Sequence, residues 1–114
     1  VARIRRACER FGRRFLQRIF TEGEMAYVER KAHRWERYAA RFAAKEAGMK
    51  ALGTGLRRGV RWRDFEVVNA ASGKPALRLH GMAAQIATRM GVQAVHLSLT
   101  HTAETAMAMV LLEA

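Results

Sequence analysis

The first third of the chain carries hydrophobic residues at the spacing of an amphipathic helix. In residues 1–20 these positions form one stripe: Ile4, Ala7, Cys8, Phe11, Phe15, Ile19 and Phe20. Arginines occupy the rest of the helical surface, so the pattern predicts one helix over this stretch. Thr21 and Glu24 then fit a capping box, which predicts a short second helix with Met25 and Val28 turned inward.

A longer helix is predicted from about Trp35 to Leu52, closed by a glycine turn at 53–55. Its apolar stripe includes one carboxylate: Trp35, Tyr38, Ala39, Phe42, Glu46 and Met49. A buried and unpaired carboxylate costs several kcal/mol, so Glu46 is expected to need a cation. That cation is either Lys50, one turn further on, or a metal ion. An ordinary Glu–Lys pair on a half-wet face, worth about 0.2–0.5 kcal/mol, explains the same spacing.

The second half of the chain changes to the alternating pattern of β-strands. A strand at about 64–68, a turn at 69–75 and a returning strand through Leu77 and Leu79 form a first hairpin. A short helix from Met82 to Met90 follows. Strands at 95–100 and 106–112, joined by a turn at 101–105, form a second hairpin. We therefore expect a single α+β domain over residues 1–114, with the N-terminal helices packed on a small antiparallel sheet. An exposed sheet edge would favour self-association.

Charge narrows the choice of partners. Lys and Arg number 21 against 10 Asp and Glu, a net charge of +11. Residues 1–18 and residues 38–63 each hold seven basic residues and one Glu, so each block carries +6. Such concentrated blocks indicate an acidic partner: nucleic acid, a phosphorylated small molecule or an acidic protein.

Other features exclude several classes of protein. One Cys and four scattered His give no zinc-ligand spacing. No apolar run approaches the roughly 20 residues that span a bilayer, so no membrane is expected. Cys8 is the single cysteine and cannot form an internal disulfide, which favours a cytoplasmic location.

Three short segments suit phosphate groups. Lys50 precedes the turn of Gly53 and Gly55, Lys74 follows a glycine at a turn, and His101–Thr102 lies at a hairpin tip. Each segment alone is explained by a helix C-cap, a β-turn or polar loop residues. Together with Glu46 they suggest a polyphosphate ligand held through a metal ion.

The run RFAAKEAGMKALGTG at residues 41–55 resembles the signature of holo-(acyl-carrier-protein) synthase, the 4′-phosphopantetheinyl transferase family of fatty-acid synthesis. Segments 14–22, 65–67, 73–75 and 97–102 match this family in the same order, so that the resemblance covers essentially all 114 residues. It implies a 4′-phosphopantetheinyl transferase-like fold. It also implies Mg²⁺-dependent transfer of phosphopantetheine from coenzyme A to a serine of an acyl carrier protein, with release of 3′,5′-ADP.

The resemblance also implies roles for particular residues. Glu46 matches the family's magnesium ligand and is expected to help deprotonate the attacking serine, directly or through water. Lys50 matches the lysine that contacts the coenzyme A phosphates. The nucleotide end of coenzyme A is expected to contact residues on later segments: Gly53, Lys74, Ser98, His101 and Thr102.

The first basic block gains a role from the same resemblance. An acidic acyl carrier protein is expected to dock on Arg3, Arg10, Arg14 and Phe15, guided by charge. The family forms homotrimers with active sites at subunit interfaces. It also opens with a strand that carries a second magnesium ligand, an aspartate, just upstream of the segment matched by Val1–Ile4. No aspartate precedes Asp64 here, so either the sequence is clipped at its N-terminus and lacks this first strand, or this version lacks half of the metal site. We expect clipping, because the rest of the site is intact.

Two other functions remain open from the residues alone. A basic nucleic-acid-binding module would explain the charge, but most aromatic residues fall on the apolar stripes and no reading helix is recognisable. A non-catalytic relative would bind the carrier protein through the first helix without transferring anything. The resemblance favours the enzyme, with no nucleic-acid partner.

Overall fold

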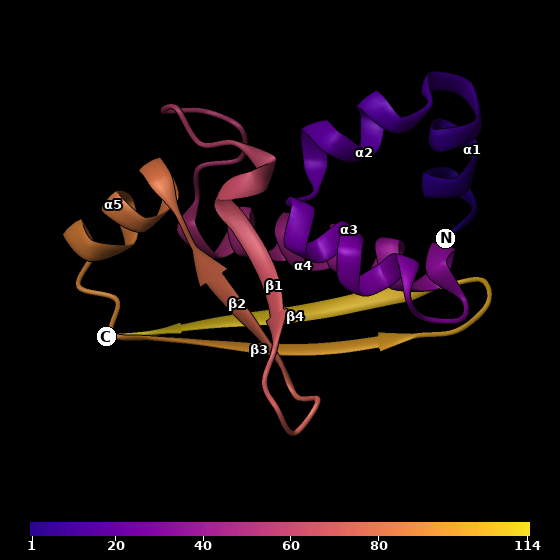
Figure 1. The fold of residues 1–114 in the computed structure, drawn as a ribbon. Coiled ribbons are helices and arrows are strands. Elements are labelled where there is room, and N and C mark those ends of the chain that lie inside the picture. Colours follow the sequence, from indigo (N-terminus) through magenta and orange to yellow (C-terminus); the bar gives the residue numbers. More distant parts are fainter.

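The computed structural model describes all residues from 1 to 114, and its elements follow the predicted order (Figure 1). The helices are α1 (Ala2–Phe11), α2 (Arg13–Ile19), α3 (Glu22–Glu29), α4 (Arg34–Leu52) and α5 (Gly81–Arg89), with a 3-10 turn η1 (Trp62–Asp64). The strands are β1 (Phe65–Asn69), β2 (Pro75–Leu79), β3 (Ala94–His101) and β4 (Ala106–Glu113). They pair as two antiparallel hairpins, β1 with β2 and β3 with β4. The predicted α+β class is confirmed.

The predicted first helix is broken into α1 and α2, so that prediction was wrong. Gly12 interrupts it with φ at 72°, a left-handed conformation that a residue without Cβ adopts freely. The break changes the direction of the chain, but Ile4 of α1 and Ile19 of α2 still pack in one buried cluster. Phe11 is 61% exposed as a result, whereas Ile4 and Leu16 are buried.

The predicted capping box at the start of α3 is confirmed. The backbone N–H of Glu24 donates to Thr21 Oγ1 at 3.1 Å, and the backbone N–H of Thr21 donates to Glu24 Oε1 at 2.9 Å. Glu24 is 1% exposed, although a capping carboxylate usually reaches solvent. Its burial becomes important for the site described below.

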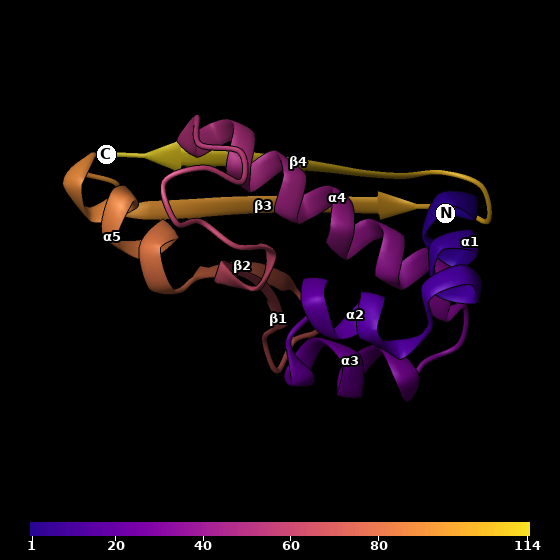
Figure 2. The ribbon, with the colours of Figure 1, turned by 90° about the horizontal axis from the view of Figure 1, so that it is seen from above.

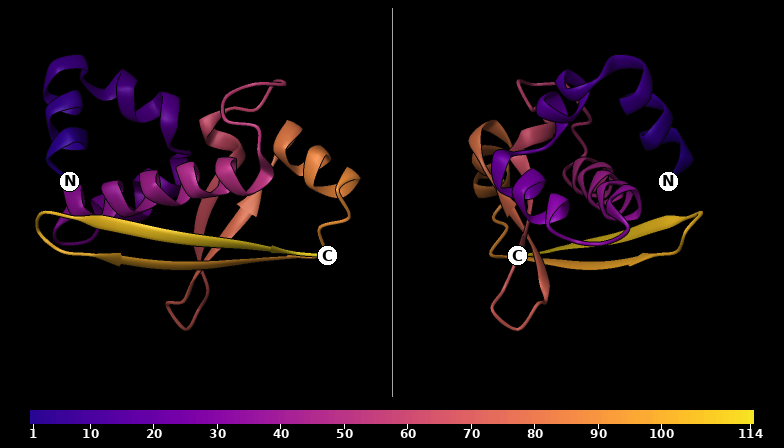
Figure 3. Two further views of the ribbon diagram at one scale, coloured as in Figure 1. Left: turned by 180° about the vertical axis from the view of Figure 1, so that it is seen from behind. Right: turned by 45° about the vertical axis from the view of Figure 1, so that its right-hand side comes forward.

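The long helix α4 is the central element of the fold. It lies along one face of the β3–β4 hairpin, with α2 and α3 on its other side (Figures 2 and 3). Tyr38 and Ala39, in its first half, pack in a cluster with α1, α2 and α3. Residues of its second half, such as Met49, pack with β1, β2 and α5. Trp62 touches both clusters and stacks on Phe42, with ring centroids 4.8 Å apart.

One glycine inside α4 allows the helix to approach β1 closely. A Cβ at Gly48 would lie 2.7 Å from Cδ1 of Phe65, a ring that is completely buried. Glycine in a helix interior costs about 1 kcal/mol relative to alanine. At this cost, the absence of a Cβ at Gly48 allows α4 to pack directly on Phe65.

The outer face of the β3–β4 hairpin is apolar and exposed. Met107, Met109 and Leu111 on β4 are 62%, 70% and 61% exposed. They stand opposite polar residues of β3 in the register, with Ser98 facing Met109. Exposed apolar groups gathered on one face are typical of a surface that binds another protein or another copy of the same chain.

Candidate functional site

In α4, Lys45 is buried and its neighbour Glu46 is exposed. This corrects the prediction made for Glu46. Glu46 was expected on the apolar side of the helix, but it is exposed and forms no ion pair with Lys50 or any other residue. Lys45 takes the buried position instead, with a side chain that is 0% exposed. The reason is that α3, η1 and β1 supply acceptors for an ammonium group on that side. Glu46 therefore needs no cation to stabilise the folded chain.

Glu46 lines a hollow of about 450 Å³ between α1, α2, α4 and the start of β4. Two of the predicted docking residues, Arg3 and Phe15, line the same hollow, and so does Arg6. Most of the other lining residues are apolar, including Phe42. The hollow therefore combines one free carboxylate, two arginines and an apolar wall.

The remaining docking residues lie outside this hollow. Arg10 is exposed, and its guanidinium carbon lies 5.3 Å from the ring centroid of Phe11. Arg14 is exposed at the start of α2. The structure thus brings Arg3, Phe15 and Glu46 together, while Arg10 and Arg14 belong to the surrounding basic surface.

The predicted phosphate-binding residues are exposed and lie at several places. Lys50 is in the last turn of α4, and Gly53 caps that helix in a left-handed conformation with φ at 76°. Lys74 lies in the turn between β1 and β2, and Ser98 lies on the outer face of β3. Thr102, in the turn between β3 and β4, accepts hydrogen bonds from the backbone N–H groups of Glu104 and Thr105.

Gly53 and His101 lie at opposite ends of α4. His101 Nδ1 is 3.0 Å from Glu36 Oε1, in the first turn of the helix. Gly53 follows the last turn, about 25 Å further along at the usual rise of a helix. The turn between β1 and β2, which holds Lys74, and the end of β3, which holds His101, are also separated (Figure 1). One copy of the chain does not gather these residues around a single small ligand.

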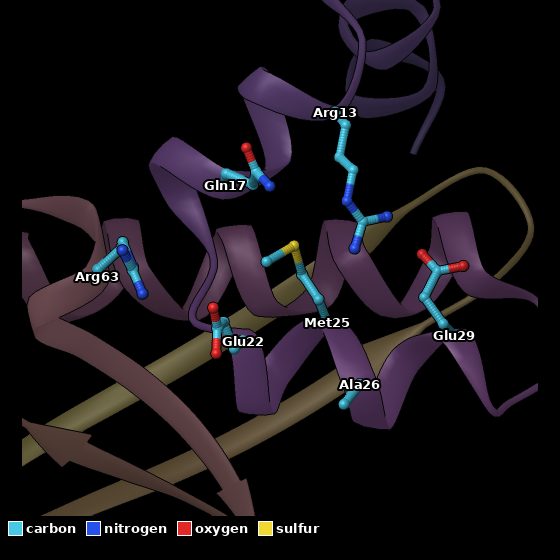
Figure 4. A pocket seen from close by; sticks show the side chains of 7 residues that line it. All are labelled: Arg13, Gln17, Glu22, Met25, Ala26, Glu29 and Arg63. Carbon is cyan, nitrogen blue, oxygen red and sulfur yellow. The ribbon is translucent and has the colours of Figure 1, made fainter.

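A second hollow, between α2, α3 and η1, contains none of the predicted site residues (Figure 4). Its volume is about 560 Å³, and Arg13 reaches across it from α2 toward α3. Glu22 and Glu29 are its two acidic residues. Glu29 already has partners, because Tyr38 donates a hydrogen bond at 2.6 Å and Arg34 another at 3.0 Å. The hydrogen bond from Tyr38 holds the pKa of Glu29 below its usual value. We assign no ligand to this hollow.

The sequence prediction missed the buried cations of α4. Lys45 donates to Glu24 Oε1 at 2.8 Å, and Arg41 donates to Asn69 Oδ1 at 3.0 Å. Burial lowers the pKa of both groups, and the Glu24 charge opposes this in each case. Nε of Arg41 has no partner, and its guanidinium lies over the ring of Tyr27 at 4.8 Å. Residues 41, 45, 48 and 52 recur at helical spacing along this face of α4. Because two of them are charged, the sequence alone indicated that the face is exposed to solvent.

No group of three or more His, Cys, Asp or Glu side chains in residues 1–114 could hold a metal ion by itself. Magnesium sites in phosphate-processing proteins use one or two carboxylates and complete the coordination with substrate phosphates and water. A single free carboxylate such as Glu46 fits that kind of site.

No helix has the length and apolar character needed to cross a membrane.

Comparison with known proteins shows the family to which the chain belongs. A family model described as the 4′-phosphopantetheinyl transferase superfamily matches residues 1–110. The holo-[acyl-carrier-protein] synthase of Solibacter usitatus is 64% identical over 113 residues, which cover 99% of this chain and 90% of that protein. The structure of this chain resembles that of the holo-[acyl-carrier-protein] synthase from Neisseria meningitidis with a TM-score of 0.88 and 35% identity, covering 99% of this chain and 90% of that one. The structure of the Helicobacter pylori enzyme in complex with coenzyme A gives a TM-score of 0.84 and 26% identity. That match covers 98% of this chain and 92% of that one.

The chain therefore belongs to the 4′-phosphopantetheinyl transferase superfamily. Within that superfamily its relatives are holo-[acyl-carrier-protein] synthases, and the chain is a transferase of this type. The predicted resemblance is confirmed. The comparisons do not support the nucleic-acid-binding module or the non-catalytic relative.

Proposed function

We propose that this chain transfers 4′-phosphopantetheine from coenzyme A to a serine of an apo-acyl carrier protein in a Mg²⁺-dependent reaction that serves fatty-acid synthesis. The observation that carries the proposal is the free carboxylate of Glu46, which shares one hollow with Arg3 and Phe15. The Helicobacter pylori relative was solved with coenzyme A bound, which supports coenzyme A as the donor. The cytoplasm, where both coenzyme A and a reduced Cys8 are expected, is the proposed location.

The chemistry assigned to the chain is a displacement at phosphorus. The serine oxygen of the carrier forms a bond to the phosphorus atom that carries the pantetheine arm. The bond from that phosphorus to the bridging pyrophosphate oxygen breaks, and 3′,5′-ADP leaves with the electron pair. Glu46 takes the serine proton as general base. Mg²⁺, when bound at this carboxylate, would neutralise the charge that develops on the pyrophosphate.

Several residues would bind and orient the two substrates. Lys50, one turn beyond Glu46 and equally exposed, is the proposed contact for the pyrophosphate of coenzyme A. Gly53, Lys74, Ser98, His101 and Thr102 are proposed to contact the nucleotide end. Because one copy of the chain holds Gly53 and His101 at opposite ends of α4, a shared nucleotide site requires residues from two copies.

A homotrimer would supply such shared sites. The exposed apolar face with Met107, Met109 and Leu111 is the proposed contact between copies.

The basic surface of α1 and α2 is proposed to receive the acidic carrier protein. Arg3 and Phe15 lie at the hollow, so a carrier docked there would bring its serine toward Glu46. Arg10 and Arg14 would act at longer range, since surface charges of this kind mainly raise the rate of encounter.

Release of 3′,5′-ADP tests the proposal. Wild-type chain, coenzyme A, Mg²⁺ and apo-acyl carrier protein should give 3′,5′-ADP, detected by chromatography, and omission of the carrier or of Mg²⁺ should stop it. Replacement of Glu46 by Gln should reduce the rate by about 10²- to 10⁴-fold, the usual contribution of a general base. Near-normal turnover of Glu46→Gln would contradict the assigned role.

A further inference from the structure

Lys45 is bound by three segments that lie far apart in the sequence. Its ammonium group donates to Glu24 Oε1 of α3 at 2.8 Å, to the backbone carbonyl of Trp62 in η1 at 3.3 Å and to that of Phe65 in β1. The side chain is 0% exposed. A lysine ammonium has three N–H donors, so all of them are used inside the protein.

The carboxylate of Glu24 is equally well occupied. Besides the bond from Lys45, it accepts the backbone N–H of Thr21 at 2.9 Å and the backbone N–H of Val67 at 2.9 Å. Thr21 begins α3 and Val67 lies in the middle of β1. Glu24 therefore ties α3, α4 and β1 together at one point. Well-packed apolar residues in place of a buried ion pair often give the same stability. The Glu24–Lys45 pair is therefore better explained by the arrangement of α3, α4 and β1 that it specifies.

Neighbouring contacts on the same face of α4 hold the helix against β1. One turn before Lys45, Arg41 donates to Asn69 Oδ1 at the end of β1. One turn after it, Gly48 allows the close approach to Phe65. Consecutive residues of a helix point about 100° apart, because 3.6 residues complete a turn. The direction in which Lys45 is fixed therefore also determines the direction of Glu46, toward the hollow with Arg3 and Phe15.

We infer that Lys45 and Glu24 are positioning residues for the transfer reaction, which fix the rotation of α4 about its axis and thereby aim Glu46 at the hollow. The inference rests on the proposed function, since that function assigns Glu46 to the reaction. Lys45 touches no substrate in this role. It acts through the helix that carries the carboxylate, and displacement by about 1 Å at such a group costs up to about 100-fold in rate.

Replacement of Lys45 by Met tests the inference. Met keeps most of the volume and removes all three hydrogen bonds. The kcat for transfer should fall about 10- to 100-fold, the range seen when residues that support a metal ligand are replaced. The KM for the carrier protein should stay unchanged, because the α1 surface is not altered. Calorimetric titration of coenzyme A at several Mg²⁺ concentrations supplies a readout besides activity. The Mg²⁺ concentration that gives half-maximal enhancement of coenzyme A binding should rise.

Loss of stability alone must be separated from loss of position. Ile86 of α5 is 2% exposed and has no part in the Glu24–Lys45 contacts, so Ile86→Ala weakens the core without removing any of these contacts. The exposed Lys31 supplies the same substitution as a surface control, Lys31→Met. Both variants, assayed below their unfolding temperatures, should keep the wild-type kcat and Mg²⁺ dependence.

A second variant keeps the test decisive if Lys45→Met fails to fold. Glu24→Gln removes the charged acceptor but leaves the contacts of Lys45 with the Trp62 and Phe65 carbonyls, and it should shift the Mg²⁺ dependence in the same direction. Wild-type kcat and Mg²⁺ dependence in a folded Lys45 or Glu24 variant would overturn the inference, as would an equal loss in Ile86→Ala. A wild-type chain that transfers nothing, with and without the family's opening strand, would instead contradict the proposed function.

Discussion

Lys45 and Glu46 are adjacent in the sequence, yet the Lys45 ammonium is sealed in the protein interior and the Glu46 carboxylate is exposed beside a hollow. The pair shows how one helix performs two tasks. One face of α4 is attached to α3 and β1 through buried charges and a close glycine contact. The adjacent face presents the carboxylate that the proposed reaction requires.

Reversal of charge at Arg3 should weaken carrier binding. Arg3→Glu places a negative charge in the hollow where the acidic carrier is proposed to dock, so the KM for the carrier should rise about tenfold or more, with kcat little changed. The matched control is Arg89→Glu, on the exposed end of α5, which has the same change in net charge. Steady-state kinetics at two salt concentrations measure both effects. Equal KM changes in the two variants would show that only net charge matters.

A charge on the outer face of β4 should prevent self-association. Met109 is 70% exposed, and Met109→Glu would bury a carboxylate in the proposed contact between copies. Light scattering coupled to size-exclusion chromatography should show a trimer for the wild type and a monomer for this variant. Met90→Glu, at an exposed site directly after α5, should remain a trimer. A monomeric wild type would contradict the trimer proposal.

Replacement of Gly48 by Ala should destabilise the fold, although the intrinsic helix preference favours alanine by about 1 kcal/mol. The added Cβ would lie 2.7 Å from the buried ring of Phe65, and overpacking of this kind costs about 1–3 kcal/mol. Urea unfolding measures the difference. Addition of Phe65→Leu should recover the part of the lost stability that comes from the clash. A Gly48→Ala variant more stable than wild type would show that α4 can move away from β1.

The contact between Tyr38 and Glu29 should make stability depend on pH in the acid range. The hydrogen bond from Tyr38 lowers the pKa of Glu29 from its usual 4.5. A lowered carboxyl pKa contributes stability above the usual pKa, and this contribution is lost as the pH falls through the lowered value. Tyr38→Phe should therefore cost about 1 kcal/mol at pH 7, and the difference from wild type should shrink below pH 4.5.

The matched control for this pH dependence is Tyr27→Phe. The Tyr27 hydroxyl forms no hydrogen bond with a carboxylate, so its loss should give a difference from wild type that is constant across the same pH range. Urea unfolding from pH 3 to pH 7 measures both variants. A constant difference for Tyr38→Phe as well would contradict the role given to Glu29.

The sequence predicted those elements whose signals are local. Thr21 and Glu24 identified the start of α3, and the glycine turn at 53–55 identified the end of α4, because caps depend on residues within one helical turn. The alternating pattern of residues 95–100 likewise predicted β3. The break at Gly12 was missed, because the hydrophobic stripe continues across the glycine without interruption.

The exchange of Lys45 and Glu46 could not be predicted in the same way. The two residues differ by 100° on the helix, and the acceptors that favour burial of Lys45 come from Glu24, Trp62 and Phe65. Only the tertiary fold brings these groups together. The predicted site residues in the hollow, Arg3, Phe15 and Glu46, were named from the family resemblance. The spacing of Glu46 and Lys50 alone is also explained by an ordinary Glu–Lys pair.

The mass of the carrier protein is the most direct measure of the proposed transfer. Apo-acyl carrier protein is incubated with coenzyme A, Mg²⁺ and the chain, and is then weighed by intact mass spectrometry. Residues 1–114 and the same chain preceded by the family's opening strand are compared. We predict a gain of one phosphopantetheine group, lost in Glu46→Gln. An unchanged carrier mass with both forms of the chain would contradict transfer by this protein.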